Sequence, residues 1–299
     1  MLSMLLTAIA AQSVVGTSHT TLVLLGTGTP RPDPERFGPA AAVVVNGEAY
    51  LVDCGPGVVR RASSARAAGV DALAPIKVKH VFITHLHSDH TLGYPDLILS
   101  PWVVGRKEPL EAFGPKGLAT MTSHLLSAFS EDIELRTRGL ERGNMTGYKV
   151  NVHEIQSGLI FKDKNVTVTA IPVKHGAWKH AFGYKFETAD RVIVFSGDTA
   201  PSTELESAAK NADILVHEVY ASAEAAPENR PGGEEWPVYM RAYHTSAEEL
   251  GAMASRCKPK LLLLVHVLNR RGTDKVLLEE IVKGGFNGKT EIGTDLAIY

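Results

Sequence analysis

The stretch HVFITHLHSDH, residues 80–90, decides how the rest of the chain is interpreted. Residues 80–84 form a short apolar run rich in β-branched and aromatic side chains, which is typical of a buried strand. His85, His87, Asp89 and His90 follow within six residues. Polar side chains so close to a core need partners, and a loop after a strand can turn them toward one point. The stretch predicts that His85 and His87 share one metal ion while Asp89 and His90 reach a second. A solvated loop rich in histidine is the alternative.

Three further candidate ligands stand where other apolar runs end. His175 follows VTVTAIPVK, Asp198 follows RVIVFSG, and His266 follows KLLLLV. Each residue alone is better explained as a hydrogen-bonded structural group. Together with the histidine-rich stretch they indicate ligands that converge on one rim of a sheet, because the carboxyl ends of neighbouring strands can meet there.

The remaining chain alternates apolar runs with amphipathic ones. Strands are expected at residues 21–25, 41–45, 49–52, 80–84, 150–155, 166–173, 183–187, 191–196, 214–216, 261–265 and 290–292, and helices at 58–69, 91–100, 116–130, 204–211, 246–256 and 274–283. Asn46-Gly47 is a strong hairpin signal. Strands grouped in hairpins, with helices outside them, predict two sheets packed face to face and covered by helices.

The ligand pattern resembles the metallo-β-lactamase superfamily from about residue 21 to the C-terminus, through HLHSDH, His175, Gly197-Asp198-Thr199 and His266. The resemblance implies an α/β fold, a four-layer αββα sandwich of two packed mixed β-sheets flanked by helices. It also implies a dinuclear hydrolase with two Zn²⁺ ions, although manganese or iron would suit the same nitrogen and oxygen ligands. The implied nucleophile is a hydroxide held by the metals. In this assignment one zinc is held by His85, His87 and His175, the other by Asp89, His90 and His266, and Asp198 bridges them.

Further motifs resemble the ribonuclease Z branch of this superfamily. These are LGTGTP at residues 25–30, VDCGPG at 52–57, His217-Glu218 and His244-Thr245-Ser246. Glycine-rich turns let backbone N–H groups approach an oxyanion, although a purely structural turn is the alternative. The resemblance makes His244 the general acid for the leaving oxygen, with Glu218 orienting it, and allows Asp89 to accept the proton of the attacking water. A helix start that happens to contain a histidine is the alternative for His244.

The substrate expected from the sequence is a small anionic ester, either a phosphodiester or an aryl or alkyl sulfate. Ribonuclease Z carries a long tRNA-gripping arm between the third-motif histidine and the bridging aspartate, but only 23 residues separate His175 from Asp198 here. With 31 Lys+Arg, 33 Asp+Glu and a net charge of −2, nucleic acid is not the favoured partner. An RNA 3′-processing endonuclease of the ribonuclease Z type is kept as an alternative.

Residues 221–243 are expected to form a substrate-facing lid, because the segment combines prolines, glycines and three aromatic side chains just before His244. Trp178 is a candidate second wall. Arg270 and Arg271 would pair with an anionic substrate or stay solvated. Two other functions remain open: a lactone or β-lactam hydrolase, which needs no His244, and a non-catalytic binding protein on the same scaffold. A homodimer is plausible by resemblance only.

The cellular address is left undecided by the sequence. Residues 1–16 are apolar and uncharged. Residues 1–20 are therefore an N-terminal extension or a signal segment, and residues 21–299 are expected to form a single hydrolase domain. A signal peptide at residues 1–10 would make the protein periplasmic or secreted, and otherwise it is expected in the cytoplasm. No membrane association is expected. Cys54 and Cys257, the two cysteines, are expected to be small buried residues.

Overall fold

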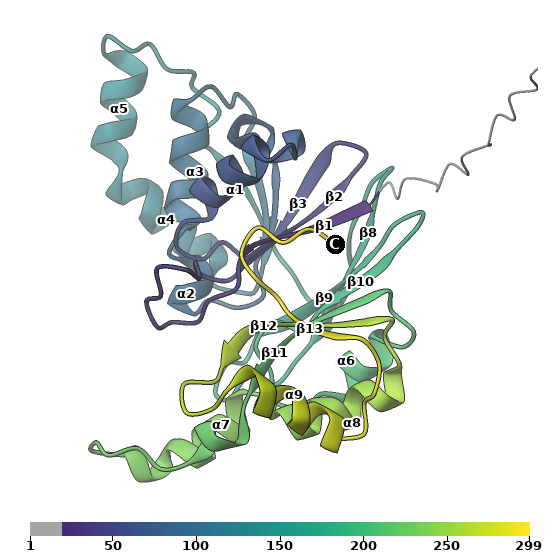
Figure 1. Ribbon diagram of the computed structural model, residues 1–299. Coiled ribbons are helices and arrows are strands. Elements are labelled where there is room, and N and C mark those ends of the chain that lie inside the picture. Colours follow the sequence, from purple (N-terminus) through teal and green to yellow (C-terminus); the bar gives the residue numbers. More distant parts are fainter. Residues whose placement is uncertain (1–19) are drawn as a thin grey trace, which may run out of the picture.

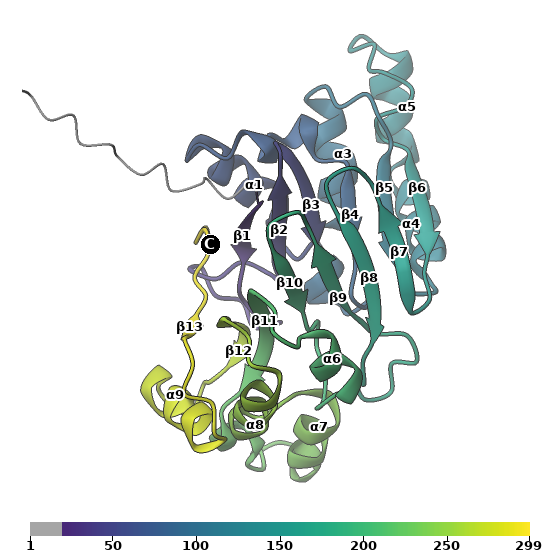
Figure 2. The same ribbon diagram turned by 90° about the vertical axis from the view of Figure 1, so that its right-hand side faces the viewer.

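A computed structural model describes residues 20–299 as two β-sheets packed face to face, with helices covering both outer surfaces (Figures 1 and 2). The helices near the N-terminal half cover one sheet, and those of the C-terminal half cover the other. This is the expected four-layer αββα arrangement. The signal segment considered for residues 1–10 lies outside the described residues.

The first sheet has the order β1-β2-β3-β4-β5-β6. Strands β1 to β3 are antiparallel, and β3 to β6 run parallel to one another. The hairpin between β2 and β3 turns at Asn46-Gly47, where both residues have positive φ, as predicted. The strands are β1 (Thr20–Gly26), β2 (Ala40–Val45), β3 (Glu48–Val52), β4 (His80–Phe82), β5 (Leu110–Gly114) and β6 (Val150–Glu154).

The second sheet has the order β13-β12-β11-β10-β9-β8-β7. Strands β7 to β10 are antiparallel, whereas β10 to β13 are parallel, so the sheet is mixed. The strands are β7 (Gly158–Lys162), β8 (Thr167–Pro172), β9 (Phe182–Glu187), β10 (Val192–Phe195), β11 (Ile214–Tyr220), β12 (Leu261–Leu268) and β13 (Thr290–Ile292).

The helices fall into two groups. Those along the first sheet are α1 (Val58–Ala67), α2 (Ser88–Thr91), α3 (Tyr94–Val103), α4 (Leu118–Ala128) and α5 (Ser130–Arg138). Those along the second are α6 (Thr203–Ala208), α7 (Trp236–Tyr243), α8 (Ala247–Cys257) and α9 (Asp274–Lys283). Short 3-10 turns occupy Asp71–Leu73, Pro75–Lys77, Ser222–Ala225 and Gly233–Glu235. None of the helices in residues 20–299 is long and apolar enough to span a bilayer.

Successive side chains along each strand point to opposite faces of the sheet, and this alternation produces three apolar layers. In β1, Leu22 and Leu24 point between the sheets, while Val23 and Leu25 point toward the helices beside the first sheet. A third layer fills the space between the second sheet and α6, α8 and α9, and includes buried Cys257. Cys54 is also buried.

Several elements differ from the sequence-based expectation. β5, β7 and α5 were not predicted. β5 is a short run between prolines, and the exposed edge strand β7 shows little apolar alternation. The helix expected at 91–100 is split by Gly93 into α2 and α3. The segment 221–243, expected to be a loop, ends in the regular helix α7.

Candidate active site

The seven predicted ligands come from both halves of the molecule and meet at one rim of the sandwich. The loop after β4 supplies His85 and His87, and α2 supplies Asp89 and His90. The segments after β8 and β10 supply His175 and Asp198, and His266 lies in β12 with a left-handed φ of 45°. The rim brings together side chains up to 181 residues apart in sequence, as the topology of the two sheets requires.

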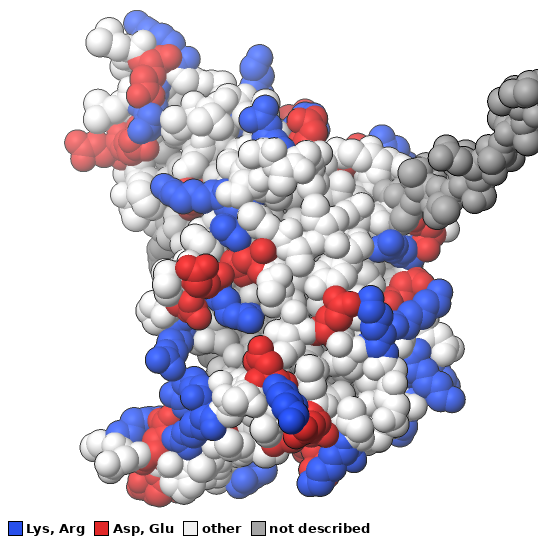
Figure 3. All heavy atoms as spheres, in the orientation of Figure 1, with Lys and Arg blue, Asp and Glu red and all other residues white. Residues whose placement is uncertain are grey.

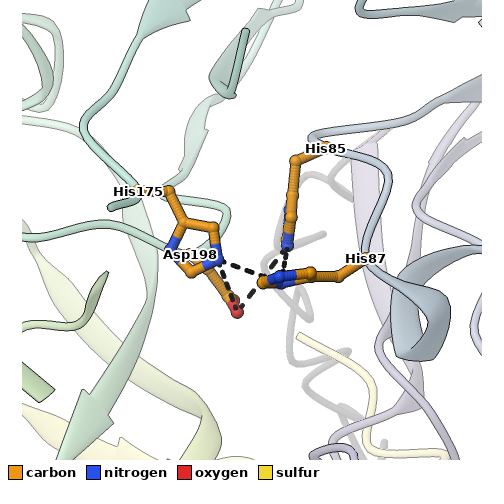
Figure 4. A group of neighbouring side chains, drawn as sticks. All are labelled: His85, His87, His175 and Asp198. Atoms are coloured by element: carbon orange, nitrogen blue, oxygen red, sulfur yellow. Dashed lines mark hydrogen bonds and ion pairs between the residues drawn. The ribbon is translucent and has the colours of Figure 1, made fainter. Parts of the chain in front are cut away.

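The first group of side chains is His85, His87, His175 and Asp198 (Figure 4). His87 Nδ1 lies 3.0 Å from His85 Nε2 and 3.1 Å from His175 Nε2. Asp198 Oδ2 is 3.9 Å from Nε2 of both His85 and His175. A tetrahedral zinc ion with Zn–N bonds of 2.0–2.1 Å needs ligand nitrogens about 3.3 Å apart. The spacing of the three nitrogens is close to that value.

The second group is Asp89, His90 and His266. Asp89 Oδ2 lies 3.2 Å from His266 Nε2 and 3.5 Å from His90 Nε2. Asp198 faces this group too, with Oδ1 3.5 Å from His90 Nε2 and Oδ2 3.5 Å from His266 Nε2. Asp198 is therefore the carboxylate shared by the two groups. The grouping matches the predicted one, and the role of these residues as ligands stays a prediction.

Bound cations explain the arrangement of the donor atoms better than hydrogen bonds among the side chains themselves. His90 Nε2 is buried and has no hydrogen-bond partner among the described residues, although it points at two carboxylates. Burying an unpartnered polar atom is costly unless something else binds it. In the first group, three imidazole nitrogens crowd together, and neutral rings lack enough protons to bond them all. Both features suit a site built for two cations.

The charge state of the first group also suits metal binding. Burial lowers the pKa of His85 and His87, and it lowers the pKa of His175 to about 4. Burial alone would raise the pKa of Asp198, but the charges of His266 and His90 outweigh it, so that this carboxyl ionises well below its usual range. Neutral imidazoles beside an ionised carboxylate are the forms that coordinate a metal.

A network behind the ligands fixes the direction of two rings. His90 Nδ1 lies 2.8 Å from Oδ2 of Asp53, and a carboxylate only accepts, so the ring donates through Nδ1 and turns Nε2 to the site. Thr84 donates to Asp53 through both its N–H and its hydroxyl, and its Oγ1 lies 3.0 Å from His85 Nδ1. Such outer contacts tune ligand geometry. Neither residue type reveals this role in the sequence, although Asp53 lies in the VDCGPG motif.

The third histidine is fixed by a backbone group. His175 Nδ1 donates to the carbonyl oxygen of Tyr243 over 2.7 Å, which leaves Nε2 free to face the first group. Gly176 N–H donates to the carbonyl of Ala242, and Ala177 N–H donates to the Tyr243 hydroxyl. The end of α7 is therefore bonded to the loop that carries His175. No residue-type pattern reveals a carbonyl partner.

Trp178 contributes a contact that conflicts with a metal at His87. Its indole Nε1 donates to His87 Nε2 over 2.7 Å, which places the proton of the neutral ring on Nδ1. Because Nδ1 is the atom in the first group, binding a cation there requires that proton to leave and the indole contact to change. Trp178 is half-buried beside the group, where the sequence analysis expected a wall.

The two residues predicted to act as an acid pair, His244 and Glu218, lie close together next to Asp198. His244 Nδ1 lies 3.3 Å from Oε1 of Glu218, and both residues are almost completely buried. Glu218 Oε1 also accepts from the N–H groups of Thr199 and Thr245, which holds the carboxylate in place. Burial lowers the pKa of His244, but the charge of Glu218 outweighs burial and raises that pKa above its usual value. The arrangement favours a protonated imidazole close to the candidate metal site.

The glycine-rich turns are structural. In LGTGTP, Gly28 N–H donates to the carbonyl of Phe37 and Thr27 N–H donates to Asp295. In VDCGPG, Cys54 N–H donates to the carbonyl of His90 and Gly55 N–H to that of Pro39. These donors are used inside the protein, so the suggested contact with an oxyanion is not supported.

The two arginines after His266 are held by acidic residues of the 221–243 segment. Arg270 Nε and the backbone N–H of Arg271 donate to the carboxylate of buried Glu224. Arg270 also pairs with Glu228 over 2.8 Å. They are neither free for a substrate nor simply solvated. Instead they fasten the start of this segment to the end of β12.

Comparison with known proteins identifies the family. A model described as "Beta-lactamase superfamily domain" matches residues 48–267. A protein named ribonuclease Z from Mycobacterium bovis (strain BCG / Pasteur 1173P2) is 33% identical over 281 residues, which cover 92% of this chain and 96% of the relative. Ribonuclease Z from Mycobacterium sp. (strain KMS) is 36% identical over 254 residues, covering 83% of this chain and 84% of the relative.

Solved structures agree on the fold. The metallo-β-lactamase fold protein YhfI from Bacillus subtilis superposes with a TM-score of 0.70 at 17% identity, over 94% of this chain and 98% of that one. The short form of human tRNase Z superposes with a TM-score of 0.68 at 22% identity, over 93% of this chain and 98% of that one.

The expectation that nucleic acid is not the partner is wrong. The relatives are named for RNA cleavage, and the alignment with the first spans 96% of its length, so that relative has little sequence beyond what this chain carries. The short interval between His175 and Asp198 therefore does not exclude RNA. Net charge does not exclude it either, because charges of both signs are spread over the face in Figure 3 and binding depends on local cations.

The metal-ligand pattern, the two-sheet fold and the related sequences all agree. Proteins of this fold typically bind a dinuclear metal centre, and the candidate ligand groups are present here. The chain belongs to the metallo-β-lactamase superfamily, in its ribonuclease Z-like branch.

Proposed function

We propose that this protein is a zinc-dependent endoribonuclease of the ribonuclease Z type that hydrolyses a phosphodiester bond in RNA. The observation that carries the proposal is the buried His244–Glu218 pair, 3.3 Å apart, beside a carboxylate shared by two ligand groups. Similarity to proteins named ribonuclease Z over more than nine-tenths of the chain supports RNA, rather than a sulfate ester, as the substrate class. The proposed ligands are His85, His87, Asp89, His90, His175, Asp198 and His266.

The metals, when bound, would lower the pKa of an attacking water and polarise the phosphate. The chain's own residues move the protons. Burial opposes ionisation of Asp89, but the hydrogen bond from His266 and the charge of His90 lower its pKa, so the residue is a carboxylate that can accept the proton of that water. His244 donates a proton to the leaving oxygen, and the carboxylate of Glu218, 3.3 Å from its Nδ1, favours the charged form of the imidazole.

The test compares substrates on one preparation of zinc-loaded and manganese-loaded protein. The substrates are an RNA hairpin with a 3′ extension, bis(p-nitrophenyl) phosphate, p-nitrophenyl sulfate and a simple lactone. Asp198→Ala serves as the blank. We expect cleavage of the RNA at one junction and turnover of the phosphodiester, both absent in the blank.

Other results would redirect the assignment. Sulfate or lactone turnover without RNA cleavage would replace the proposed substrate class. Tight binding of RNA by the metal-loaded protein without any turnover would favour a binding protein on this scaffold. RNA cleavage with manganese but not with zinc would replace the proposed resident metal.

A further inference from the structure

A groove of about 420 Å³ lies where the edges of the two sheets meet. One side is the connection from β6 to β7, residues 154–157, and the other is formed by residues 172–173 and 179–182 around the loop from β8 to β9. Figure 2 shows β6, β7 and β8 along this edge. The volume is in the range of sites that hold small ligands, and so has room for about one nucleotide.

The groove is lined by cations that have no acidic partner. Lys116 and Lys179 line it, both are exposed, and neither forms an ion pair with any residue between 20 and 299. His180 adds a third basic side chain. The only acidic residue in the lining, Glu154, accepts from the N–H groups of Gly117 and Ala119 at the start of α4, so its charge is already engaged by a helix terminus.

The groove adjoins the candidate metal site. Gly117, next to Lys116, packs against the side chain of Leu86, the residue between His85 and His87. From the other side, Phe182 N–H donates to the carbonyl of Thr84 over 2.9 Å. Both walls of the groove therefore contact the segment that carries His85, from which a strand bound at the candidate metal site would continue.

We propose that Lys116 and Lys179 form a contact site for the RNA backbone, binding phosphates of the strand that runs into the active site. This inference rests on the proposed function and adds the residues that bind the RNA backbone next to the scissile bond. Unpaired lysines bind phosphate as point charges, and each contact releases counterions from the RNA. A substrate without a backbone on either side of the scissile bond does not reach this groove.

The test is a salt series on zinc-loaded protein, with binding of fluorescently labelled RNA measured by anisotropy and cleavage measured in parallel. For single-stranded nucleic acid the logarithm of affinity falls with the logarithm of salt with a slope of about −0.7 per phosphate contact. The double variant Lys116→Ala, Lys179→Ala should reduce this slope by about 1.4. At 0.1 M salt its affinity should be weaker by roughly 25-fold, with the difference disappearing toward 1 M.

A matched control is available on the same strands. Lys107 and Lys149 are exposed lysines without ion pairs among the described residues, and they precede β5 and β6 at the ends opposite the groove. Lys107→Ala, Lys149→Ala should leave the slope unchanged. Both double variants should turn over bis(p-nitrophenyl) phosphate like the wild type, and Lys116→Arg, Lys179→Arg should retain RNA affinity.

The outcomes separate this inference from the proposed function. An unchanged salt slope in the groove variant, or an equal loss in the control, overturns the groove as the contact site. Binding that depends on the two lysines, without cleavage, supports the groove and overturns the endonuclease. Wild-type protein that neither binds nor cleaves RNA overturns both.

Discussion

The substitution Gly176→Ala should weaken metal binding at the first ligand group, although it adds only a methyl group to a residue that is not itself a ligand. A Cβ at Gly176 would lie 1.9 Å from Cζ of Tyr243 and 2.0 Å from its Cε2. The ring must retreat by about 1.5 Å to reach ordinary van der Waals contact. The backbone carbonyl of Tyr243 accepts from His175 Nδ1 over 2.7 Å, so a movement of the Tyr243 backbone that accompanies the ring would weaken this hydrogen bond.

The size of the effect follows from two contributions. Alanine at the left-handed φ of Gly176, +53°, costs about 1–2 kcal/mol, and overpacking costs about 1–3 kcal/mol unless the ring moves. If Tyr243 moves, the stability loss shrinks, but His175 loses its outer partner. Loss of such a partner typically reduces metal affinity by about 10- to 100-fold.

The assay is zinc competition with a chromophoric chelator, together with urea unfolding of the metal-free protein. Gly232→Ala is the control, because Gly232 also has a left-handed φ, +73°, but has open space around the added methyl group. It should show the conformational cost alone. Equal zinc affinity in the two variants would refute the idea that Tyr243 positions His175.

Three further predictions concern the acid pair, the indole contact and a buried cation. Glu218→Gln removes the charge that raises the pKa of His244. The alkaline limb of the kcat–pH profile for RNA cleavage should therefore move to lower pH. An unchanged alkaline limb would exclude His244 as the acid. Zinc titration should change indole fluorescence and Trp178→Phe should abolish most of that change, whereas an unaltered signal would mean that the contact with His87 Nε2 persists. Arg106→Met should lower the free energy of unfolding in urea by about 2–5 kcal/mol. The buried guanidinium donates to the carbonyls of Leu97, Ile98 and Gly147, and these acceptors would lose their partner. A loss below about 1 kcal/mol would contradict this role.

The sequence predicted the candidate site best where the proposed metal ligands are close together in the chain. In HLHSDH the donors are adjacent, so their joint purpose follows from their residue types and spacing. His175, Asp198 and His266 could be predicted because His175 and Asp198 follow recognisable strands and His266 lies near the end of one. Parallel strands direct their carboxyl ends to one rim.

Contacts that depend on three-dimensional packing were not predictable in the same way. The bond between Asp53 and His90 joins residues 37 apart and depends on how β3 and β4 pair. The partner of His175 is a backbone carbonyl, which every residue has. Lys116 and Lys179 are 63 positions apart, and they line one groove because the chain passes from the first sheet to the second between β6 and β7. Arg270 was ambiguous because a charged residue in a sequence does not reveal whether an acidic partner lies nearby.

The 221–243 segment contacts both a proposed metal ligand and the proposed acid. In α7 the rings of Trp236, Tyr239 and Tyr243 stack in succession, with centroids 4.8 and 4.4 Å apart, and the column ends beside His175 and His244. Tyr243 bonds one proposed ligand through its carbonyl and directly precedes the proposed acid. Displacement of this column by a substrate would therefore act on the metal group and on the proton donor together. Substitutions in α7 should consequently change kcat as well as KM, whereas removing the groove lysines should change binding alone.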